Sequence, residues 1–105
     1  MPPSIDPKVA LLQALIRGES YGLELIDRVR DATQGRVVLG QGSVYPALRD
    51  LEAEGYLESY DGPAMPERGG RPRRYYRITA QGMRAAHEEA SALLGLFRPA
   101  LGVER

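Results

Sequence analysis

Apolar residues recur at a helical spacing in four stretches of the chain. In the first stretch, Val9, Leu12 and Ile16 share one face of a short helix. Asp6 precedes this stretch and can cap the helix, because its carboxylate can accept a hydrogen bond from a free backbone N–H. Gly18 follows the stretch and is a typical helix-ending residue. The pattern therefore predicts a short core helix between these two positions.

The second stretch follows at once and predicts another amphipathic helix. Ser20 is the expected cap, and Leu25 and Val29 lie on the apolar face. Gly22 in the first turn costs about 1 kcal/mol relative to alanine, so we expect it to make room for another segment of backbone. Residues 36–39 lie beyond this helix and contain two β-branched side chains, and we expect them to form a brief strand.

The third stretch begins near Gln41 and carries Val44, Leu48 and Leu51 on its buried face. Pro46 lies within it. A proline deep inside a helix costs about 3 kcal/mol or more, because its ring clashes with the preceding turn and its N–H is missing. We therefore expect Pro46 to lie in the first turn of this helix.

The spacing changes to a period of two after the third helix. Residues 56–60 and 73–79 alternate between two kinds of side chain, as strands do, and the connection between them is long for a hairpin. These two runs predict a β-hairpin. Thr79 then caps a last helix of about 18 residues, which Pro99 and Gly102 end.

The last helix carries an apolar seam in which steps of three and four residues alternate. The seam consists of Met83, Ala86, Ala90, Leu93 and Phe97, with His87 and Leu94 at its border. Such a seam is typical of a helix that packs along another helix. At about two heptads it is too short for an independent coiled coil, so we expect it to dock on the first helix of a second copy. Packing onto its own domain is the alternative.

These elements, in this order, predict a mainly α fold with a small β-hairpin, which is the plan of a winged helix-turn-helix. Residues 1–79 are expected to form the DNA-binding domain, and residues 80–105 a C-terminal dimerisation helix of the same domain. In such folds the third helix enters the major groove of DNA, and the hairpin, called the wing, follows the backbone or the minor groove.

Composition narrows the range of functions. The 105 residues fit one domain and include no cysteine and one histidine, His87, which has no set of neighbours that would complete a metal site. No apolar run approaches the ~20 residues of a membrane span, and the N-terminus lacks the features of a signal peptide. We therefore expect a cytoplasmic protein with no membrane partner, metal or cofactor. Since no catalytic motif is found, we also expect no enzymatic activity.

The charge is distributed unevenly along the chain. The formal net charge is zero, with 14 basic and 14 acidic residues, which taken alone argues against nucleic-acid binding. One stretch of ten residues, however, contains no acid and five arginines: Arg68, Arg71, Arg73, Arg74 and Arg77. Such a cluster on a hairpin can hold phosphates in a salt-sensitive way. It can also be an ordinary solvated surface, and Arg77 can pair within the sheet.

The start of the third helix carries side chains that suit DNA. The residues expected to face away from the core there are Gln41, Gly42, Ser43, Tyr45 and Arg49. Glutamine, serine and tyrosine can donate to phosphates or base edges, and arginine can hold guanine with two hydrogen bonds. An ordinary solvent-exposed helix is the alternative, because Glu52 and Glu54 lie on the same helix.

Three segments resemble the PadR family of bacterial transcriptional regulators. They are residues 20–25, 42–57 and 71–82, and the most specific part is Tyr45-Pro46-Ala47-Leu48 followed by Leu51-Glu52 and Gly55. The resemblance implies a recognition-helix stretch of Ser43, Tyr45, Pro46 and Arg49 and a wing that includes Gly70, Arg71 and Arg73. The single short helix after the wing resembles the subgroup with a compact C-terminal part. Pro63, Met65 and Pro66 depart from the family pattern by lengthening the wing.

The resemblance also implies a dimer that represses transcription at a pseudo-palindromic operator and is released by a small molecule. The expected partners are therefore double-stranded DNA, a second copy of the chain and a small aromatic or drug-like inducer. An apolar gap near Met83, Leu94 and Phe97 would take the inducer. The rival hypothesis is a winged-helix module that binds a protein partner instead of specific DNA, which the neutral net charge favours.

Overall fold

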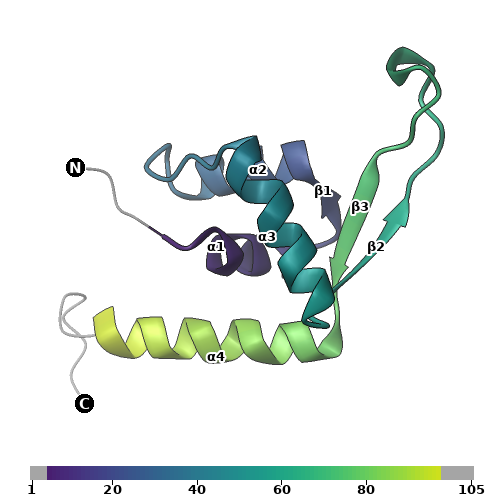
Figure 1. The fold of residues 1–105 in the computed structure, drawn as a ribbon. Coiled ribbons are helices and arrows are strands. Elements are labelled where there is room, and N and C mark those ends of the chain that lie inside the picture. Colours follow the sequence, from purple (N-terminus) through teal and green to yellow (C-terminus); the bar gives the residue numbers. More distant parts are fainter. Residues whose placement is uncertain (1–4, 98–105) are drawn as a thin grey trace.

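Residues 5–97, which the computed structural model describes, fold into four α-helices and a three-stranded antiparallel sheet (Figure 1). The helices are α1 (Pro7–Leu15), α2 (Gly22–Ala32), α3 (Gln41–Ala53) and α4 (Ala80–Phe97), and the strands are β1 (Ser20–Tyr21), β2 (Leu57–Asp61) and β3 (Arg74–Ile78). A short 3-10 helix, η1 (Pro66–Arg68), lies at the tip of the hairpin that β2 and β3 form. The predicted winged helix-turn-helix fold is confirmed. Pro99 and Gly102, expected to end α4, lie outside the described residues.

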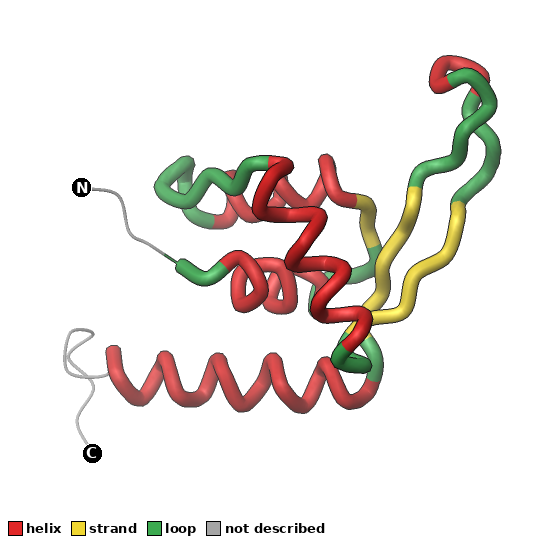
Figure 2. Tube along the Cα trace, in the orientation of Figure 1, coloured by secondary structure: helices red, strands yellow, loops and turns green. Residues whose placement is uncertain are grey.

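The core lies where α1, α2 and α3 meet, and α4 packs along α1 (Figure 2). Leucines from all three inner helices are almost completely buried there: Leu11, Leu12 and Leu15 of α1, Leu25 of α2, and Leu48 and Leu51 of α3. Burying each such side chain contributes roughly 1.5–3 kcal/mol. The apolar stripes of the three helices therefore supply most of the packing that fixes their relative positions.

A third strand, β1, joins the expected hairpin. It pairs with β3, with Ser20 opposite Tyr76 and Tyr21 opposite Tyr75, and the order across the sheet is β1-β3-β2. The expectation that Ser20 caps α2 is wrong. Its side chain is fully buried and its hydroxyl donates to the carboxylate of Glu24. Tyr21 takes the N-cap position instead, without a side-chain hydrogen bond.

Two other local predictions are wrong. Residues 36–39 form no strand and pair with none in the part of the chain that the structure describes. Pro46 is the sixth residue of α3 and so lies beyond its first turn. Its missing N–H leaves the carbonyl of Gly42 without a helical partner. Because Gly42 is exposed at the start of the helix, water can solvate that carbonyl, which lowers the cost of the proline.

The predicted caps of α1 and α4 are confirmed. The carboxylate of Asp6 accepts a hydrogen bond from the N–H of Lys8 at 2.8 Å, and the hydroxyl of Thr79 accepts one from the N–H of Gly82 at 3.0 Å. The first turn of α4 also lies directly against the segment that follows α3. A Cβ atom at Gly82 would overlap the carbonyl oxygen of Tyr56. A glycine at this position therefore sets how closely α4 approaches the rest of the domain.

We predict that Gly82→Ala destabilises the fold by about 1–3 kcal/mol, the usual cost of overpacking, because the added methyl group meets backbone that cannot move aside. Gly42→Ala in the first turn of α3 is the matched control, since a Cβ atom there meets nothing within 4 Å. The control should be neutral or stabilising by up to about 1 kcal/mol. Urea unfolding followed by circular dichroism measures both, and equal stability of the two variants would contradict the close approach of α4.

Candidate nucleic-acid interface

The polar start of α3 and the arginine-rich tip of the hairpin lie on the same side of the molecule. Figure 1 shows both at the upper end, with α4 along the opposite side. Two regions that the sequence links to DNA are therefore brought together by the fold. This arrangement suits a single flat or rod-shaped partner that contacts both regions at once.

One face of α3 is buried and the other is exposed along its length. Val44, Ala47, Leu48 and Leu51 are buried, whereas all five residues expected at the interface, Gln41, Ser43, Tyr45, Pro46 and Arg49, are exposed. Gly40 caps the helix and offers no side chain to its free N–H groups. A helix start of this kind attracts a phosphate, because free N–H groups and the helix dipole both favour an anion.

The side chain of Tyr45 is held against α2. A Cβ atom at Gly22 would lie 2.6 Å from the Tyr45 ring, so glycine makes room for an aromatic side chain rather than for the backbone expected from the sequence. Tyr45 nevertheless keeps 38% of its surface exposed. The hydroxyl end of the ring thus lies against α2, while more than a third of the surface of Tyr45 remains accessible to a partner.

The tip of the wing is ordered by its own backbone. The carbonyl of Met65 accepts hydrogen bonds from the N–H groups of Arg68 and Gly70, both at 2.9 Å. The Nε of Arg71 donates to the carbonyl of Arg68 at 3.0 Å. Gly70 and Arg71 are exposed, so they stand on a defined turn rather than on a loose loop.

Two of the wing arginines are paired with acids across the hairpin. Arg74 contacts Asp61 at 3.0 Å and Arg77 contacts Glu58 at 3.0 Å. The hydrogen bond that Arg74 donates to the carboxylate of Asp61 also raises the pKa of Arg74. Both arginines remain more than half exposed, and exposed pairs of this kind contribute only about 0–1 kcal/mol. The wing is therefore less basic than its acid-free sequence suggests.

Arg73 is folded back onto the sheet instead of projecting outward. Its guanidinium lies 4.4 Å from the centre of the Tyr21 ring, and its Nη1 donates to the sulfur of Met65 at 3.3 Å. Its Nε is buried and has no hydrogen-bond partner among residues 5–97. A phosphate contact by Arg73 would therefore require this side chain to change partners.

Tyrosines line the face of the sheet that points away from the core. Tyr75 contacts Tyr21 edge-on at 5.4 Å and stacks on Tyr60 at 5.6 Å, and Arg77 lies 5.5 Å from the Tyr60 ring. The hydroxyl of Tyr60 donates to Glu19, which raises the pKa of Tyr60. Sequence reasoning did not find this row, because it depends on β1 lying beside β3. The row stiffens the base of the wing.

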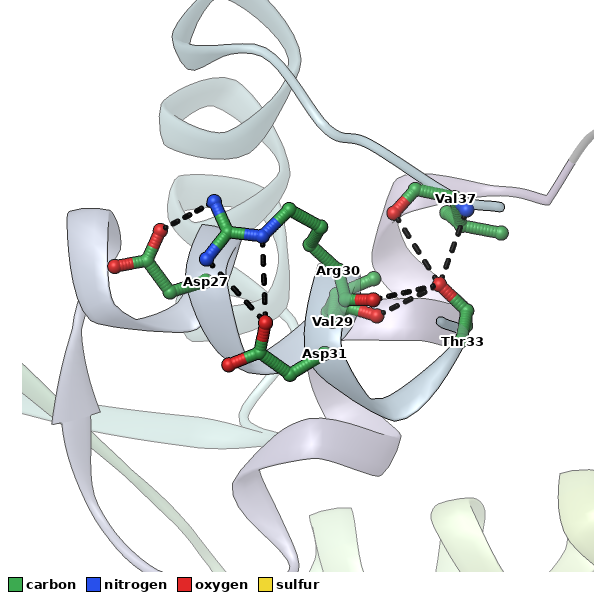
Figure 3. A network of polar contacts seen from close by, with 6 residues as sticks. All are labelled: Asp27, Val29, Arg30, Asp31, Thr33 and Val37. Atoms are coloured by element: carbon green, nitrogen blue, oxygen red, sulfur yellow. Dashed lines mark hydrogen bonds and ion pairs between the residues drawn. The ribbon is translucent and has the colours of Figure 1, made fainter. Parts of the chain in front are cut away.

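The connection between α2 and α3 is held by one threonine (Figure 3). The hydroxyl of Thr33 donates to the carbonyl of Val29 at 2.9 Å and accepts from the N–H of Val37 at 3.0 Å. The exposed residues of this connection include Arg36 and Val38. Both lie within five residues of the start of α3. Arg36 was not identified from the sequence. Its position, as a basic residue in the turn before the expected recognition helix, could have indicated it.

Figure 3 also shows the ion pairs in the last turns of α2. Arg30 lies between two acids, Asp27 at 3.1 Å and Asp31 at 3.3 Å. These exposed pairs are individually weak, but they occupy Arg30 with contacts along its own helix. Arg36 has no ion pair among the described residues. The loop therefore presents one unpaired guanidinium beside the start of α3.

The seam of α4 divides into two halves with different surroundings. Ala86 is fully buried inside its own chain, and its carbonyl accepts a hydrogen bond from the side chain of Gln13 in α1 at 2.8 Å. Its expected place in a dimer interface is corrected accordingly, because no surface of Ala86 is left for a partner. Met83 and Ala90 are half-buried.

The second half of α4 is exposed. Leu93, Leu94 and Leu96 expose 37%, 57% and 71% of their surface, and His87 is exposed as well. The side chain of Phe97 lies outside what the structure describes. A cluster of exposed leucines at the end of a helix is typical of a protein contact.

An apolar hollow of about 370 Å³ lies beside the end of α4. Its lining comes mainly from α1 and α2 and includes Val9, Gln13, Ile16, Val29 and Leu93. The described lining contains no aromatic side chain. The hollow can therefore take apolar groups but offers no ring on which a flat molecule could stack.

Two further kinds of site find no support within residues 5–97. No group of three or more His, Cys, Asp or Glu side chains there could hold a metal ion. No helix there is both long and apolar enough to cross a membrane.

We predict that Thr33→Val destabilises the loop before α3, because the N–H of buried Val37 loses its acceptor at a cost of about 1–3 kcal/mol. Thr33→Ser keeps the hydroxyl and is the matched control. Amide hydrogen exchange at Val37 and urea unfolding measure the two effects. The prediction is contradicted if exchange at Val37 accelerates equally in both variants.

Several solved structures share this fold. A transcriptional regulator from Clostridium thermocellum is 29% identical with a TM-score of 0.73, over 90% of this chain and 88% of that one. A PadR family regulator from Eggerthella lenta is 29% identical with a TM-score of 0.67, over 90% and 77%. The circadian clock associated protein Pex from Anabaena is 28% identical with a TM-score of 0.67, over 95% and 88%.

No protein with a curated description matches the chain. A family model, however, identifies the family from the amino-acid sequence. The model of the Transcriptional regulator PadR-like family matches residues 11–88, which include the helix-turn-helix, the wing and the first half of α4. This family consists of transcriptional regulators, which act by binding DNA. The chain belongs to the PadR-like family of transcriptional regulators.

Proposed function

We propose that the protein is a repressor that binds a pseudo-palindromic operator as a homodimer and is released by a small molecule. The observation that carries this proposal is the exposed polar face of α3 beside the arginine-bearing wing (Figure 1). In this proposal α3 lies in the major groove and the wing follows the adjacent backbone. Since its ligand is genomic DNA, we place its work in the cytoplasm.

Base reading is assigned to the exposed side of α3. Arg49 can hold guanine with two hydrogen bonds, and Gln41 can do the same with adenine. Ser43 and the braced hydroxyl of Tyr45 can donate to a base edge or a phosphate. Pro46 can add an apolar contact, and its backbone nitrogen carries no hydrogen that could be donated. A fixed side-chain orientation, as at Tyr45, favours discrimination between bases, because little freedom is lost on binding.

Phosphate binding is assigned to the wing and the loop before α3. Arg71 and Arg36 are exposed and have no acidic partner among the described residues. They lie on either side of α3 in the chain, so they can grip the backbone on both sides of one groove. Gly70 lets the wing backbone approach closely. Arg73 and Arg74 join the interface by exchanging Tyr21 and Asp61 for phosphate oxygens.

A second copy is the proposed partner of α4. The exposed leucines at the end of α4 and the hollow between α1 and α2 are adjacent, because Leu93 belongs to both. Insertion of the partner's α4 would cover both surfaces at once. A two-fold axis there would set two copies of α3 about one helical turn of DNA, roughly 34 Å, apart. Residues 80–105 then form the dimerisation part and residues 1–79 the DNA-binding part of one domain.

An inducer would use what remains of the same hollow. Its volume of about 370 Å³ lies at the lower end of the 300–1,000 Å³ of typical ligand pockets. Because the described lining is mainly apolar and lacks rings, shape and apolar contact would contribute most to selecting the ligand. A bound ligand would change the spacing of the two recognition helices by altering the packing of α4.

The alternative function is a winged-helix module that binds a protein. The zero net charge and the two acid-paired arginines of the wing favour it. Titration of duplexes from the region upstream of the protein's own gene discriminates the two. Tight, salt-sensitive and site-selective binding supports the repressor, and its absence at about 50–100 mM salt supports the protein-binding module.

We predict different effects of two arginine substitutions on DNA binding. Arg71→Ala removes a phosphate contact, so it should weaken binding to all duplexes alike and reduce the salt slope by about 1. Arg49→Ala should cost about 1–3 kcal/mol on the operator and much less on other duplexes. Arg84→Ala on α4 has the same charge change away from the interface and should have no effect. Fluorescence anisotropy at several salt concentrations measures all three.

The assignment of the two arginines would be wrong if both variants lost affinity equally on every duplex. The assignment of the surface would be wrong if Arg84→Ala weakened binding as much as they do.

We predict that Leu94→Glu makes the protein monomeric at concentrations where the unchanged protein is a dimer. A buried, unpaired carboxylate in an apolar interface costs several kcal/mol. Gly95→Glu, on the face of α4 opposite to Leu93, is the matched control, because Gly95 is exposed and a Cβ atom there meets nothing within 4 Å, and it should leave the dimer intact. Sedimentation velocity measures the mass of both. Dissociation by both variants, or by neither, would contradict the proposed seam.

A further inference from the structure

Met65 occupies the point where the tip of the wing meets the sheet. Its backbone carbonyl closes the turn by accepting from Arg68 and Gly70, both at 2.9 Å. Its side chain turns the other way and contacts Arg73, with 3.3 Å between the sulfur and Nη1. Met65 is only partly buried, so its side chain is not sealed off from solvent. Met65 therefore closes the turn through its backbone, contacts a basic side chain of the proposed interface and remains partly exposed to solvent.

The guanidinium of Arg73 lacks strong acceptors. Its partners are the face of the Tyr21 ring at 4.4 Å and the thioether of Met65, and its Nε is buried without a partner among residues 5–97. A thioether is a weak acceptor. A charged donor in such surroundings gains much from any oxygen placed beside it, because unsatisfied buried donors are costly. The position that could supply this oxygen is the Met65 sulfur.

We propose that Met65 is an oxidation site that controls the wing: its sulfoxide holds Arg73 on the sheet and lowers affinity for DNA. The proposal rests on the proposed function in one respect, namely that Arg73 leaves Tyr21 to bind phosphate. The oxidant is a peroxide. Its terminal oxygen is transferred to a sulfur lone pair, so that an S–O bond forms and the O–O bond breaks. Sulfur loses two electrons, and hydrogen peroxide is reduced to water.

The new oxygen changes the balance between the two positions of Arg73. A sulfoxide oxygen is a strong acceptor, and a small displacement of the two side chains would place it within hydrogen-bond distance of the guanidinium. A hydrogen bond from a charged donor to such an oxygen is stronger than one to a thioether. Arg73 then stays over Tyr21, and the interface loses one phosphate contact. Reduction of the sulfoxide by methionine sulfoxide reductase would restore binding.

The experiment compares the unchanged protein with Met65→Leu, in which a side chain of similar size cannot be oxidised. Met83→Leu on α4 is the matched control, because it removes a half-buried methionine elsewhere. Each protein is treated with hydrogen peroxide, and peptide mass mapping confirms a single added oxygen at Met65. Two readouts follow: affinity for the operator duplex by anisotropy, and the Arg73 Nε–H signal in a nitrogen-15 NMR spectrum without DNA.

Oxidation should lower the affinity of the unchanged protein and of Met83→Leu about tenfold, shift their Arg73 Nε–H signal and slow its exchange with water. Met65→Leu should change in neither readout, and sulfoxide reductase should reverse both. An unchanged Arg73 signal after complete oxidation of Met65, or an equal loss of affinity in Met65→Leu, would overturn the proposal. A protein that binds no duplex even when reduced would contradict the proposed function, while the Arg73 signal would still decide the inference about the wing.

Discussion

The pairing of β1 with β3 is the contact on which the DNA-facing surface depends. β1 has only two residues, yet Tyr21 is both the N-cap of α2 and the neighbour of Tyr75 in the sheet. The same tyrosine lies under the guanidinium of Arg73. The helix-turn-helix and the wing are thus parts of one rigid unit. A change in the position of the wing must be transmitted to α2, and through Gly22 and Tyr45 to α3.

The two halves of helix α4 have different surroundings. The first half packs on the core of its own chain, and the second half forms an external surface. Its first half is fixed by Gly82 against Tyr56 and by Gln13 bonding to Ala86. Its second half carries leucines that its own chain leaves exposed. A continuous pattern of apolar residues along the sequence of α4 therefore does not correspond to a single interface. Burial separates the half that stabilises the domain from the half that is left for a partner.

The sequence predicted what depends on local periodicity and on single capping residues. The helices, the hairpin and the caps at Asp6 and Thr79 follow from such patterns. The strand β1 could not be predicted, because two residues show no period. The position of Pro46 in α3 could not be predicted either, since its cost depends on the solvent around Gly42.

The predicted interface residues of α3 are all exposed, whereas the wing arginines differ from expectation. Asp61 and Glu58 precede the arginine stretch by several residues and meet it only through the register of the hairpin. The sequence alone therefore shows five arginines, whereas in the folded wing two of them are paired with acids. The contact of Arg73 with Tyr21 has the same origin, because it joins two distant segments of the chain.

The carboxylates of Asp61 and Glu58 act as resident counterions of the wing. When a phosphate displaces one of them from its arginine, no mobile salt ion leaves the protein, so less entropy is gained than at an unpaired arginine. Contacts with arbitrary duplex are weakened most, because they depend on this entropy alone. We therefore expect the wing to hold arbitrary duplex less tightly than its arginine content implies.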